Sequence, residues 1–307
     1  MRIAILGAGG VGGYYGGLLA RGGHQVAMLA RGSSLEALRQ RGIEIRSAEE
    51  TFTAPVAATD DPRQLGAVEL AILAVKSYSL PEIMPVVRDL AAGGATILPL
   101  LNGVEVTDRL AAAGVPVASL LGGLTRLSAA RVAPGVIERR SPFTQVVVGE
   151  LAGGISERAE RIARTLREAG AEAKASGDIT ADVWRKFAFI AAMAAACGLA
   201  RAPVGQIRIT PLGRLLLARA VGEVIAVARA RGAALDPDEE TKVLRIIDSM
   251  PATMKPSFLL DLESGGPTEL DDLSGAVSRL GRLAGLDTPV HDTAAAALAA
   301  AQPATRA

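Results

Sequence analysis

The strongest restriction on the fold comes from six residues near the N-terminus, GAGGVG, which occupy Gly7–Gly12. They follow RIAIL (Arg2–Leu6), a short run of β-forming residues, and lead into a segment whose apolar residues have helical spacing. Gly7 permits a tight turn, Gly9 lets the backbone approach a ligand, and Gly12 allows the helix to pack closely on the strand. This order of strand, glycine turn and helix is typical of a βαβ unit that holds a dinucleotide pyrophosphate at the helix N-terminus.

Apolar runs and helical patterns alternate through the first half of the chain, as they do in parallel βαβ units. The patterns predict strands at Gln25–Ala30, Leu70–Val75, Ala95–Leu100, Pro116–Leu121 and Gln145–Gly149, and helices at Val11–Arg21 and Leu35–Gln40. Ser33 and Glu36 have capping-box spacing at the start of the second helix. The first half is therefore predicted to be an α/β domain, a Rossmann doubly wound parallel sheet.

The second half of the chain has helical spacing, with Gly and Pro between the helical segments. The predicted helices are Ala181–Ala200, Pro211–Arg231, Asp238–Met250 and Ser274–Ala284. The boundary is expected near Ala175–Asp178, which gives a dinucleotide-binding domain of residues 1–176 and a second, mostly α-helical domain of residues 177–307. The second domain is expected to bind substrate, and its apolar helices would permit a homodimer.

Composition argues against several classes of protein. A chain of 307 residues, half of them hydrophobic and 21% charged, fits a folded protein of two domains. Its net charge of +1, with acids and bases interleaved, argues against a nucleic acid or an anionic membrane as partner. The longest apolar run, Phe187–Ala200, is too short to span a bilayer, and the N-terminus lacks a signal peptide. One cysteine (Cys197) and two histidines (His24 and His291) indicate a reducing cytoplasm and no metal site.

The end of the second predicted strand indicates which dinucleotide is bound. An NAD-binding unit usually has Asp or Glu there, to hold the ribose hydroxyls. This chain has ARGSS (Ala30–Ser34) instead, and Arg31 offers a planar cation for a 2′-phosphate. Although Arg31 could also be a solvated residue before a helix, the pattern favours NADP(H) over NAD(H). The predicted cofactor contacts in this part of the chain are Gly7, Gly9, Gly10, Val11, Gly12 and Arg31.

The order of the motifs resembles the ketopantoate reductase (2-dehydropantoate 2-reductase) family over nearly the whole chain. The shared motifs are GAGGVG at Gly7, AVKSY around Lys76, LLNGV around Asn102, VWRKF around Lys186, SFLLD at Ser257–Asp261 and TELDDLSG at Thr268–Gly275. The resemblance implies an N-terminal Rossmann domain that binds NADPH and a helical domain that closes over it. It also implies reduction of a small 2-keto acid to a 2-hydroxy acid, a step of pantothenate biosynthesis in that family.

The same resemblance assigns roles to five residues. Lys186 would be the general acid that protonates the developing alkoxide, while Glu269 would hold the distal hydroxyl of the substrate and order the lysine. Asn102, catalytic with these two, would lie with Lys76 beside the nicotinamide and its ribose, and Ser257 would contact the substrate carboxylate. Each also has an ordinary structural explanation as a snorkelling cation, a turn residue, a helix cap, a first-turn acid or a solvated lysine. The functional explanation is favoured over the structural one only because all five residues occur together.

The helix that contains Lys186 departs from the family pattern. Members of the family typically have asparagines four and eight residues after the lysine, where this chain has Ile190 and Ala194. Losing a buried hydrogen-bond partner costs about 1–3 kcal/mol, which argues against efficient binding of ketopantoate unless other groups compensate. We therefore expect Ile190 and Ala194 to form an apolar wall of the substrate site and to favour a 2-keto acid with an alkyl or aryl group. The alternative is that both belong to the helical core.

Two other classes of protein remain open. β-Hydroxyacid dehydrogenases also use a helical lysine, but it is usually followed by asparagine and preceded by a glycine-rich segment, which DVWRKF (residues 182–187) lacks. A non-catalytic NADP-binding sensor would keep the cofactor site without the chemistry. Retention of Lys186, Glu269, Asn102 and Ser257 argues against a sensor, whereas loss of the asparagine pair argues for one.

Overall fold

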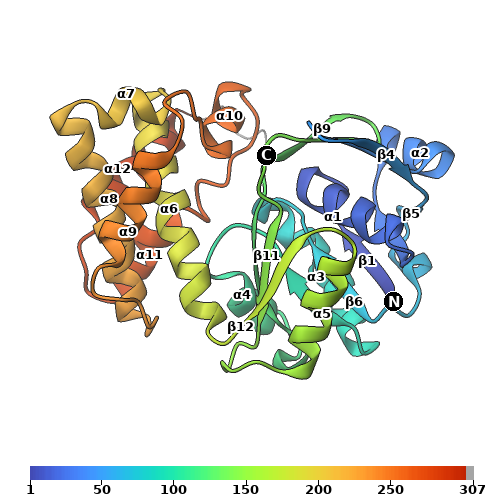
Figure 1. Ribbon diagram of the computed structural model, residues 1–307. Coiled ribbons are helices and arrows are strands. Elements are labelled where there is room, and N and C mark those ends of the chain that lie inside the picture. Colours follow the sequence, from blue (N-terminus) through green and yellow to red (C-terminus); the bar gives the residue numbers. More distant parts are fainter. Residues whose placement is uncertain (302–307) are drawn as a thin grey trace. The chain divides into compact units, whose positions relative to one another are not determined.

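The computed structural model describes residues 1–301, which separate into two compact units (Figure 1). The first unit consists of Met1–Leu101 and Val106–Thr180. The second consists of the chain from Ala181 onward together with a four-residue piece, Asn102–Glu105. This piece contains Asn102, so a residue from the sheet-forming half of the sequence belongs structurally to the helical unit.

A five-stranded parallel sheet forms the centre of the first unit. Its strands are β1 (Arg2–Leu6), β2 (Gln25–Leu29), β5 (Ala57–Thr59), β6 (Leu70–Leu73) and β7 (Thr96–Pro99), in the order β5-β2-β1-β6-β7. Strands on both sides of β1 are reached by crossovers, which is the doubly wound arrangement that the sequence predicts. The other helical segments of this unit are α2 (Gly32–Arg41), η1 (Pro62–Leu65), η2 (Ser77–Ser79), α3 (Leu80–Ala92), α4 (Val106–Ala112), η3 (Val117–Ser119) and α5 (Glu157–Glu168).

Two smaller sheets complete the first unit, and the sequence patterns missed most of their strands. One has the order β4-β3-β10-β9, with β3 at Ile43–Arg46, β4 at Thr51–Ala54, β9 at Ala129–Ala133 and β10 at Val136–Arg139. The other has the order β12-β11-β8, with β8 at Gly122–Arg126, β11 at Gln145–Gly149 and β12 at Glu172–Ser176. Several of these strands carry charged, exposed residues and therefore lack a strong apolar alternation.

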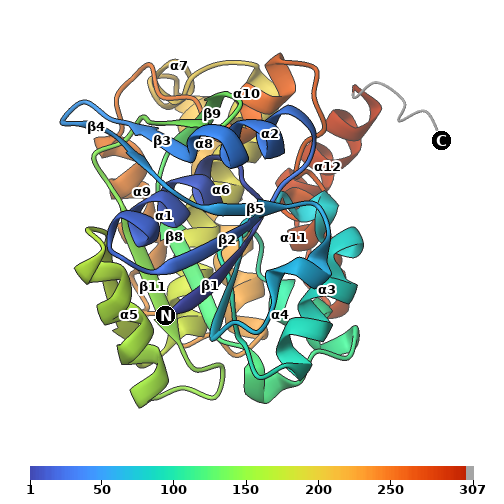
Figure 2. The same cartoon turned by 90° about the vertical axis from the view of Figure 1, so that its right-hand side faces the viewer.

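Helix α1 (Gly10–Arg21) lies between the central sheet and the β4-β3-β10-β9 sheet (Figure 2). A Cβ atom at Gly16 would lie 2.3 Å from Cε of Met28 in β2. On another face of the helix, a Cβ atom at Gly13 would lie 2.6 Å from Cγ1 of Ile137 in β10. The helix therefore presents bare backbone to both sheets, and both pack on it more closely than any side chain would allow.

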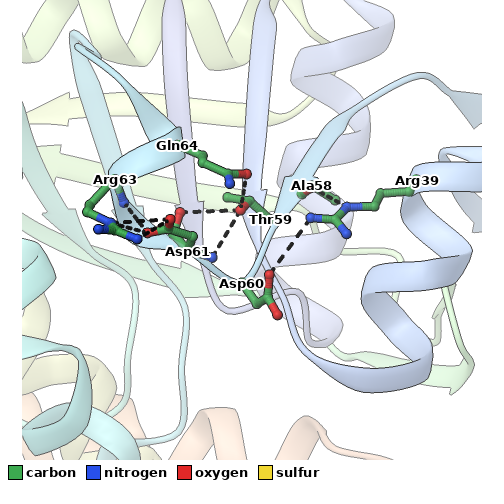
Figure 3. A network of polar contacts seen from close by, with 7 residues as sticks. All are labelled: Arg39, Ala58, Thr59, Asp60, Asp61, Arg63 and Gln64. Carbon is green, nitrogen blue, oxygen red and sulfur yellow. Dashed lines mark hydrogen bonds and ion pairs between the residues drawn. The ribbon is translucent and has the colours of Figure 1, made fainter.

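A network of polar contacts joins α2 to the end of β5 (Figure 3). Arg39 of α2 donates from Nε to the carbonyl oxygen of Ala58 at 3.0 Å and lies 3.8 Å from the carboxylate of Asp60. Asp61 then caps η1 by accepting a hydrogen bond from the Arg63 N–H at 3.0 Å. These contacts fix α2 against the edge strand of the central sheet.

The second unit is helical, with α6 (Ile179–Ala200) at its core. The other helices are α7 (Val204–Arg208), α8 (Pro211–Ala230), α9 (Glu239–Ser249), α10 (Ser257–Glu263), α11 (Ser274–Leu283) and α12 (Pro289–Ala300). The run from Ala191 to Cys197 is entirely buried among apolar residues of α8, α9, α11 and α12. In the described part of the chain, α6 is the one helix long and apolar enough to cross a membrane, but 61% of its most apolar stretch is buried, and core helices pass the same test.

The predicted strand at Pro116–Leu121 is wrong. That segment contains the short turn η3, and the strand follows it at Gly122–Arg126. The pattern missed the strand because glycine has low strand propensity. Here glycine is required, since a Cβ atom at Gly123 would lie 2.6 Å from the carbonyl oxygen of Pro99.

The predicted capping box is also wrong. Helix α2 begins at Gly32, three residues before the expected start, with Arg31 as N-cap and no side-chain cap. Ser33 therefore lies inside the first turn and is not its N-cap, and the N-cap residue offers no side-chain acceptor to the free N–H groups of that turn. The other predicted strands and helices agree with the structure to within two residues at each end.

Candidate active site

The glycine turn after β1 leaves backbone and open space for a dinucleotide. Gly7 has φ +108°, and a Cβ atom there would lie 2.8 Å from the carbonyl oxygen of Ala74. A Cβ atom at Gly12 would lie 2.1 Å from the carbonyl oxygen of Gly7, so the helix closes tightly on the turn. Gly9, the N-cap of α1, has no atom within 4 Å of its Cβ position and no side-chain cap. The residues present therefore fit a nicotinamide dinucleotide.

The first turn of α2 carries the residues expected at the 2′-phosphate. Arg31 is its N-cap, and the guanidinium lies 3.5 Å from the carboxylate of Glu82 with both side chains largely exposed. Ser34 is buried, and its hydroxyl accepts a hydrogen bond of 2.8 Å from Nη1 of Arg131. Sequence reasoning missed Arg131, because only the pairing of β9 with β10 brings it to this helix.

Lys76 lies at the carboxyl end of β6, the edge of a parallel sheet at which ligands bind. Its carbonyl oxygen accepts a hydrogen bond of 2.9 Å from the Ser79 N–H and so starts the η2 turn. Ala74, two residues before Lys76, contacts the glycine turn, since its carbonyl oxygen would lie 2.8 Å from a Cβ atom at Gly7. Gly10 and Val11 begin α1 beside the same turn.

Three of the predicted catalytic residues come together in the second unit. Lys186 donates from Nζ to Oδ1 of Asn102 at 3.0 Å. Asn102 in turn donates from Nδ2 to Oε2 of Glu269 at 3.1 Å, and Glu269 is only 5% exposed. The amide therefore uses its acceptor end for the ammonium and its donor end for the carboxylate, which defines the orientation of all three groups.

The chain conformation around these residues explains why they meet. Asn102 precedes Gly103, which has φ +110°, and the neighbouring Val104 packs into the apolar core of the second unit. Lys186 lies in the second turn of α6, where only partial burial leaves its side chain within reach of that piece. The piece Asn102–Glu105 is also tied to α11 by an ion pair from Arg279 to Glu105.

The start of α6 is anchored by the residue next to the lysine. Arg185 donates from Nε to Oε2 of Glu239 at 3.2 Å and from Nη1 to Oδ1 of Asp182 at 3.1 Å. The side chain of Glu239 is 5% exposed, so this ion pair is shielded from water on the α9 side. The contacts hold the first turns of α6 against α9 and so limit how far Lys186 can move.

The remaining predicted substrate residues lie on α6 and α10. Ile190 is partly buried and packs against the core, whereas Ala194 is 2% exposed and belongs to the core cluster. Ser257 is exposed at the first residue of α10 and takes no part in the hydrogen bonds that join Lys186, Asn102 and Glu269.

The histidines and the cysteine have structural surroundings. Nδ1 of His24 lies 3.2 Å from the N-terminal amine, and desolvation lowers the pKa of this imidazole. His291, near the start of α12, is fully buried, and burial lowers its pKa to about 4. Burial raises the pKa of the Cys197 thiol to about 12. Among residues 1–301, no group of three or more His, Cys, Asp or Glu side chains is arranged to hold a metal ion.

Comparisons with known proteins cover most of the chain. The family described as "Ketopantoate reductase PanE/ApbA" matches residues 3–153, and "Ketopantoate reductase PanE/ApbA C terminal" matches residues 178–302. The uncharacterized oxidoreductase YkpB of Bacillus subtilis (strain 168) is 36% identical over 299 residues, which is 95% of this chain and 96% of that protein.

Solved structures have the same fold. The crystal structure of 2-dehydropantoate 2-reductase from Geobacter metallireducens GS-15 matches with a TM-score of 0.90 and 29% identity, over 98% of this chain and 100% of that one. The ternary structure of D-mandelate dehydrogenase with NADH and anilino(oxo)acetate matches with a TM-score of 0.89 over 98% of each chain, and its 24% identity shows the fold alone. The two family matches, which account for most of the sequence, show that the chain belongs to the ketopantoate reductase family of oxidoreductases, which act on CH–OH groups.

Proposed function

We propose that this protein reduces a 2-keto acid to the 2-hydroxy acid with NADPH in the cytoplasm, and that Lys186 donates the proton. The observation that carries the proposal is the chain of hydrogen bonds from Lys186 through Asn102 to Glu269, at 3.0 and 3.1 Å. An ammonium held in a defined direction is the donor that carbonyl reduction requires, because negative charge develops on the carbonyl oxygen. The arrangement supports an enzyme over a sensor, which has no need of an oriented proton donor.

The bound nicotinamide would supply the hydride that forms the new C–H bond at the keto carbon. Lys186 would donate a proton from Nζ to the oxygen as the C=O bond becomes a C–O single bond. Asn102 holds the lysine before the reaction through its Oδ1, and Glu269 holds the amide in that orientation. As a carboxylate, Glu269 would also accept a hydrogen bond from a hydroxyl or other donor of the substrate.

The choice of NADPH over NADH is supported by the charge at the start of α2. Arg31 stands where NAD-binding units usually carry an acid, and the first turn of α2 has no side-chain cap. Uncapped N–H groups and a guanidinium together suit a dianionic phosphate.

The residues of α6 favour a 2-keto acid that carries an apolar group next to the keto carbon. Ile190 lies one turn after Lys186 and is only partly buried, so its side chain can contact a substrate. Ala194 is buried at 2% exposure, so it would act through the packing of α6 more than by direct contact. The fold can take such a group, since a protein of the same fold was solved with anilino(oxo)acetate.

The test is steady-state oxidation of NADPH with ketopantoate and with aryl and alkyl 2-keto acids such as benzoylformate and phenylpyruvate. We expect kcat/KM near about 10⁴ M⁻¹s⁻¹ or above for the apolar acids and at least about tenfold lower for ketopantoate. The Lys186→Ala variant should lose kcat, whereas Lys174→Ala, an exposed lysine of β12, should behave as the wild type.

The Ile190→Asn variant tests the substrate class directly. It replaces the apolar side chain by the amide usual in the family and should move the preference toward ketopantoate by about tenfold or more. Equal kcat/KM for all the acids, in the wild type and in Ile190→Asn, would show that Ile190 does not determine the substrate preference. NADPH binding without any oxidation would favour the sensor instead.

A further inference from the structure

Strand β9 contacts the starts of both helices that face the predicted cofactor site. The carbonyl oxygen of Ala129 would lie only 2.1 Å from a Cβ atom at Gly10, so the strand rests directly on the first residue of α1. Two residues further along, Nη1 of Arg131 donates to Oγ of Ser34 at 2.8 Å, in the first turn of α2. One short strand thus reaches from the pyrophosphate turn to the helix that was assigned to the 2′-phosphate.

The guanidinium of Arg131 is available for a further anion. It is used by one hydroxyl, and among residues 1–301 it forms no ion pair with a carboxylate. Arg31 differs, because Glu82 lies 3.5 Å from its guanidinium. A guanidinium has five N–H donors in a planar fork, so a bond to Ser34 leaves most of them for phosphate oxygens.

Both sides of this contact are held in place. Helix α2 is fixed to β5 by the hydrogen bond from Arg39 to the Ala58 carbonyl at 3.0 Å (Figure 3). Strand β9 is paired along its length with β10, and Arg131 lies opposite Ile137 in that pairing. Ser34 is 5% exposed, so its hydroxyl cannot swing away from the arginine. Such pre-positioning lowers the entropy lost when the guanidinium binds a ligand.

We infer that Arg131 is a second cation for the 2′-phosphate of NADP(H), acting with Arg31, and that it determines the preference for this cofactor over NAD(H). The inference rests on the proposed use of NADPH and adds to it a residue that no sequence pattern indicates. The two arginines would bind the phosphate from the start of α2 and from β9. Of the two, Arg131 would bind it without a neighbouring carboxylate that competes for the guanidinium.

The experiment measures dissociation constants for 2′,5′-ADP and 5′-AMP by calorimetry, in the wild type, Arg131→Gln, Arg131→Lys and Arg46→Gln. Arg46 is an exposed arginine of β3 in the same sheet, so its variant has the same change in charge away from α2. We expect Arg131→Gln to raise the dissociation constant of 2′,5′-ADP about tenfold or more and that of 5′-AMP less than about twofold. Arg131→Lys should recover part of the loss, and Arg46→Gln should change neither ligand. Raising the salt concentration should weaken the binding of 2′,5′-ADP less in Arg131→Gln than in the wild type.

The ligands separate the ways in which the inference can fail. If Arg131→Gln weakens the binding of both ligands equally, the arginine supports α2 and does not bind the phosphate. If it weakens neither while the wild type still prefers 2′,5′-ADP, Arg31 suffices and only the role of Arg131 is wrong. If the wild type binds both ligands equally, the proposed cofactor choice is wrong as well. None of these outcomes depends on turnover of a keto acid.

Discussion

Replacing Asn102 by alanine tests the hydrogen-bonded group of Lys186, Asn102 and Glu269, in which Asn102 is the middle residue. The change removes the acceptor 3.0 Å from Nζ of Lys186 and the donor 3.1 Å from Oε2 of Glu269. A hydrogen bond to a charged group contributes about 1.5–3 kcal/mol. If the orientation of Lys186 is needed in the transition state, losing one such bond raises the barrier by that amount, and kcat should fall about 10- to 150-fold.

The assay is steady-state oxidation of NADPH with the best keto acid, together with a separate titration of NADPH binding. Gln206→Ala is the matched control, because it removes an amide from an exposed residue of α7 in the same unit. The reasoning predicts a fall in kcat with the dissociation constant of NADPH changed less than about threefold.

Two results would refute this reasoning. A kcat within about twofold of the wild type would mean that Lys186 is oriented by other groups. A loss confined to NADPH affinity would mean that Asn102 serves the cofactor, which is the other role that the family resemblance assigns to it.

Two further predictions concern stability. Gly12→Ala should lower the free energy of unfolding by about 1–3 kcal/mol in urea titrations, because its Cβ would lie 2.1 Å from the Gly7 carbonyl oxygen. Gly9→Ala, with nothing within 4 Å, should change it by less than about 1 kcal/mol while weakening NADPH binding; equal destabilisation by both variants would contradict the assigned geometry. His291 has a folded-state pKa of about 4 against 6.5 when unfolded, so the unfolded chain takes up more protons and stability should fall as the pH drops through that window. The fall should reach about 3 kcal/mol in urea titrations, and His291→Gln should flatten it; an unchanged pH dependence in the variant would assign the effect to other groups.

The fold could be predicted where the sequence pattern is strong and local. The four predicted helices of the second unit (α6, α8, α9 and α11) and the four predicted strands of the central sheet (β1, β2, β6 and β7) have strong apolar patterns. Their bounds agree with the structure within two residues, whereas the short elements α7, α10 and β5 were not predicted. The strands β3, β9 and β10 were missed because they carry charged residues on exposed faces, so that long-range pairing and not local propensity forms them. The capping box was wrong because α2 begins at Gly32, so that Ser33, the predicted cap, lies inside the first turn and Arg31 is the N-cap.

The site could be predicted only through the family resemblance. Asn102 and Lys186 are 84 residues apart in the sequence, and Asn102 and Glu269 are 167 apart, so no spacing rule connects them. The structure brings these three together, while Lys76 and the glycine turn belong to the other unit and Ser257 stands outside the hydrogen-bonded group. The roles of all these residues remain predictions until variants are measured.

The bare faces of α1 have a consequence for how such a protein can change its electron carrier. Because both sheets rest on the backbone of the helix, the turn that every dinucleotide uses is a fixed reference point that tolerates little alteration. The two side chains proposed to distinguish NADP(H) from NAD(H), Arg31 and Arg131, are exposed at the start of α2 and on β9, where replacement costs little stability. If these arginines have the proposed role, cofactor preference can change by substitutions at the surface while the closely packed part of the site stays the same.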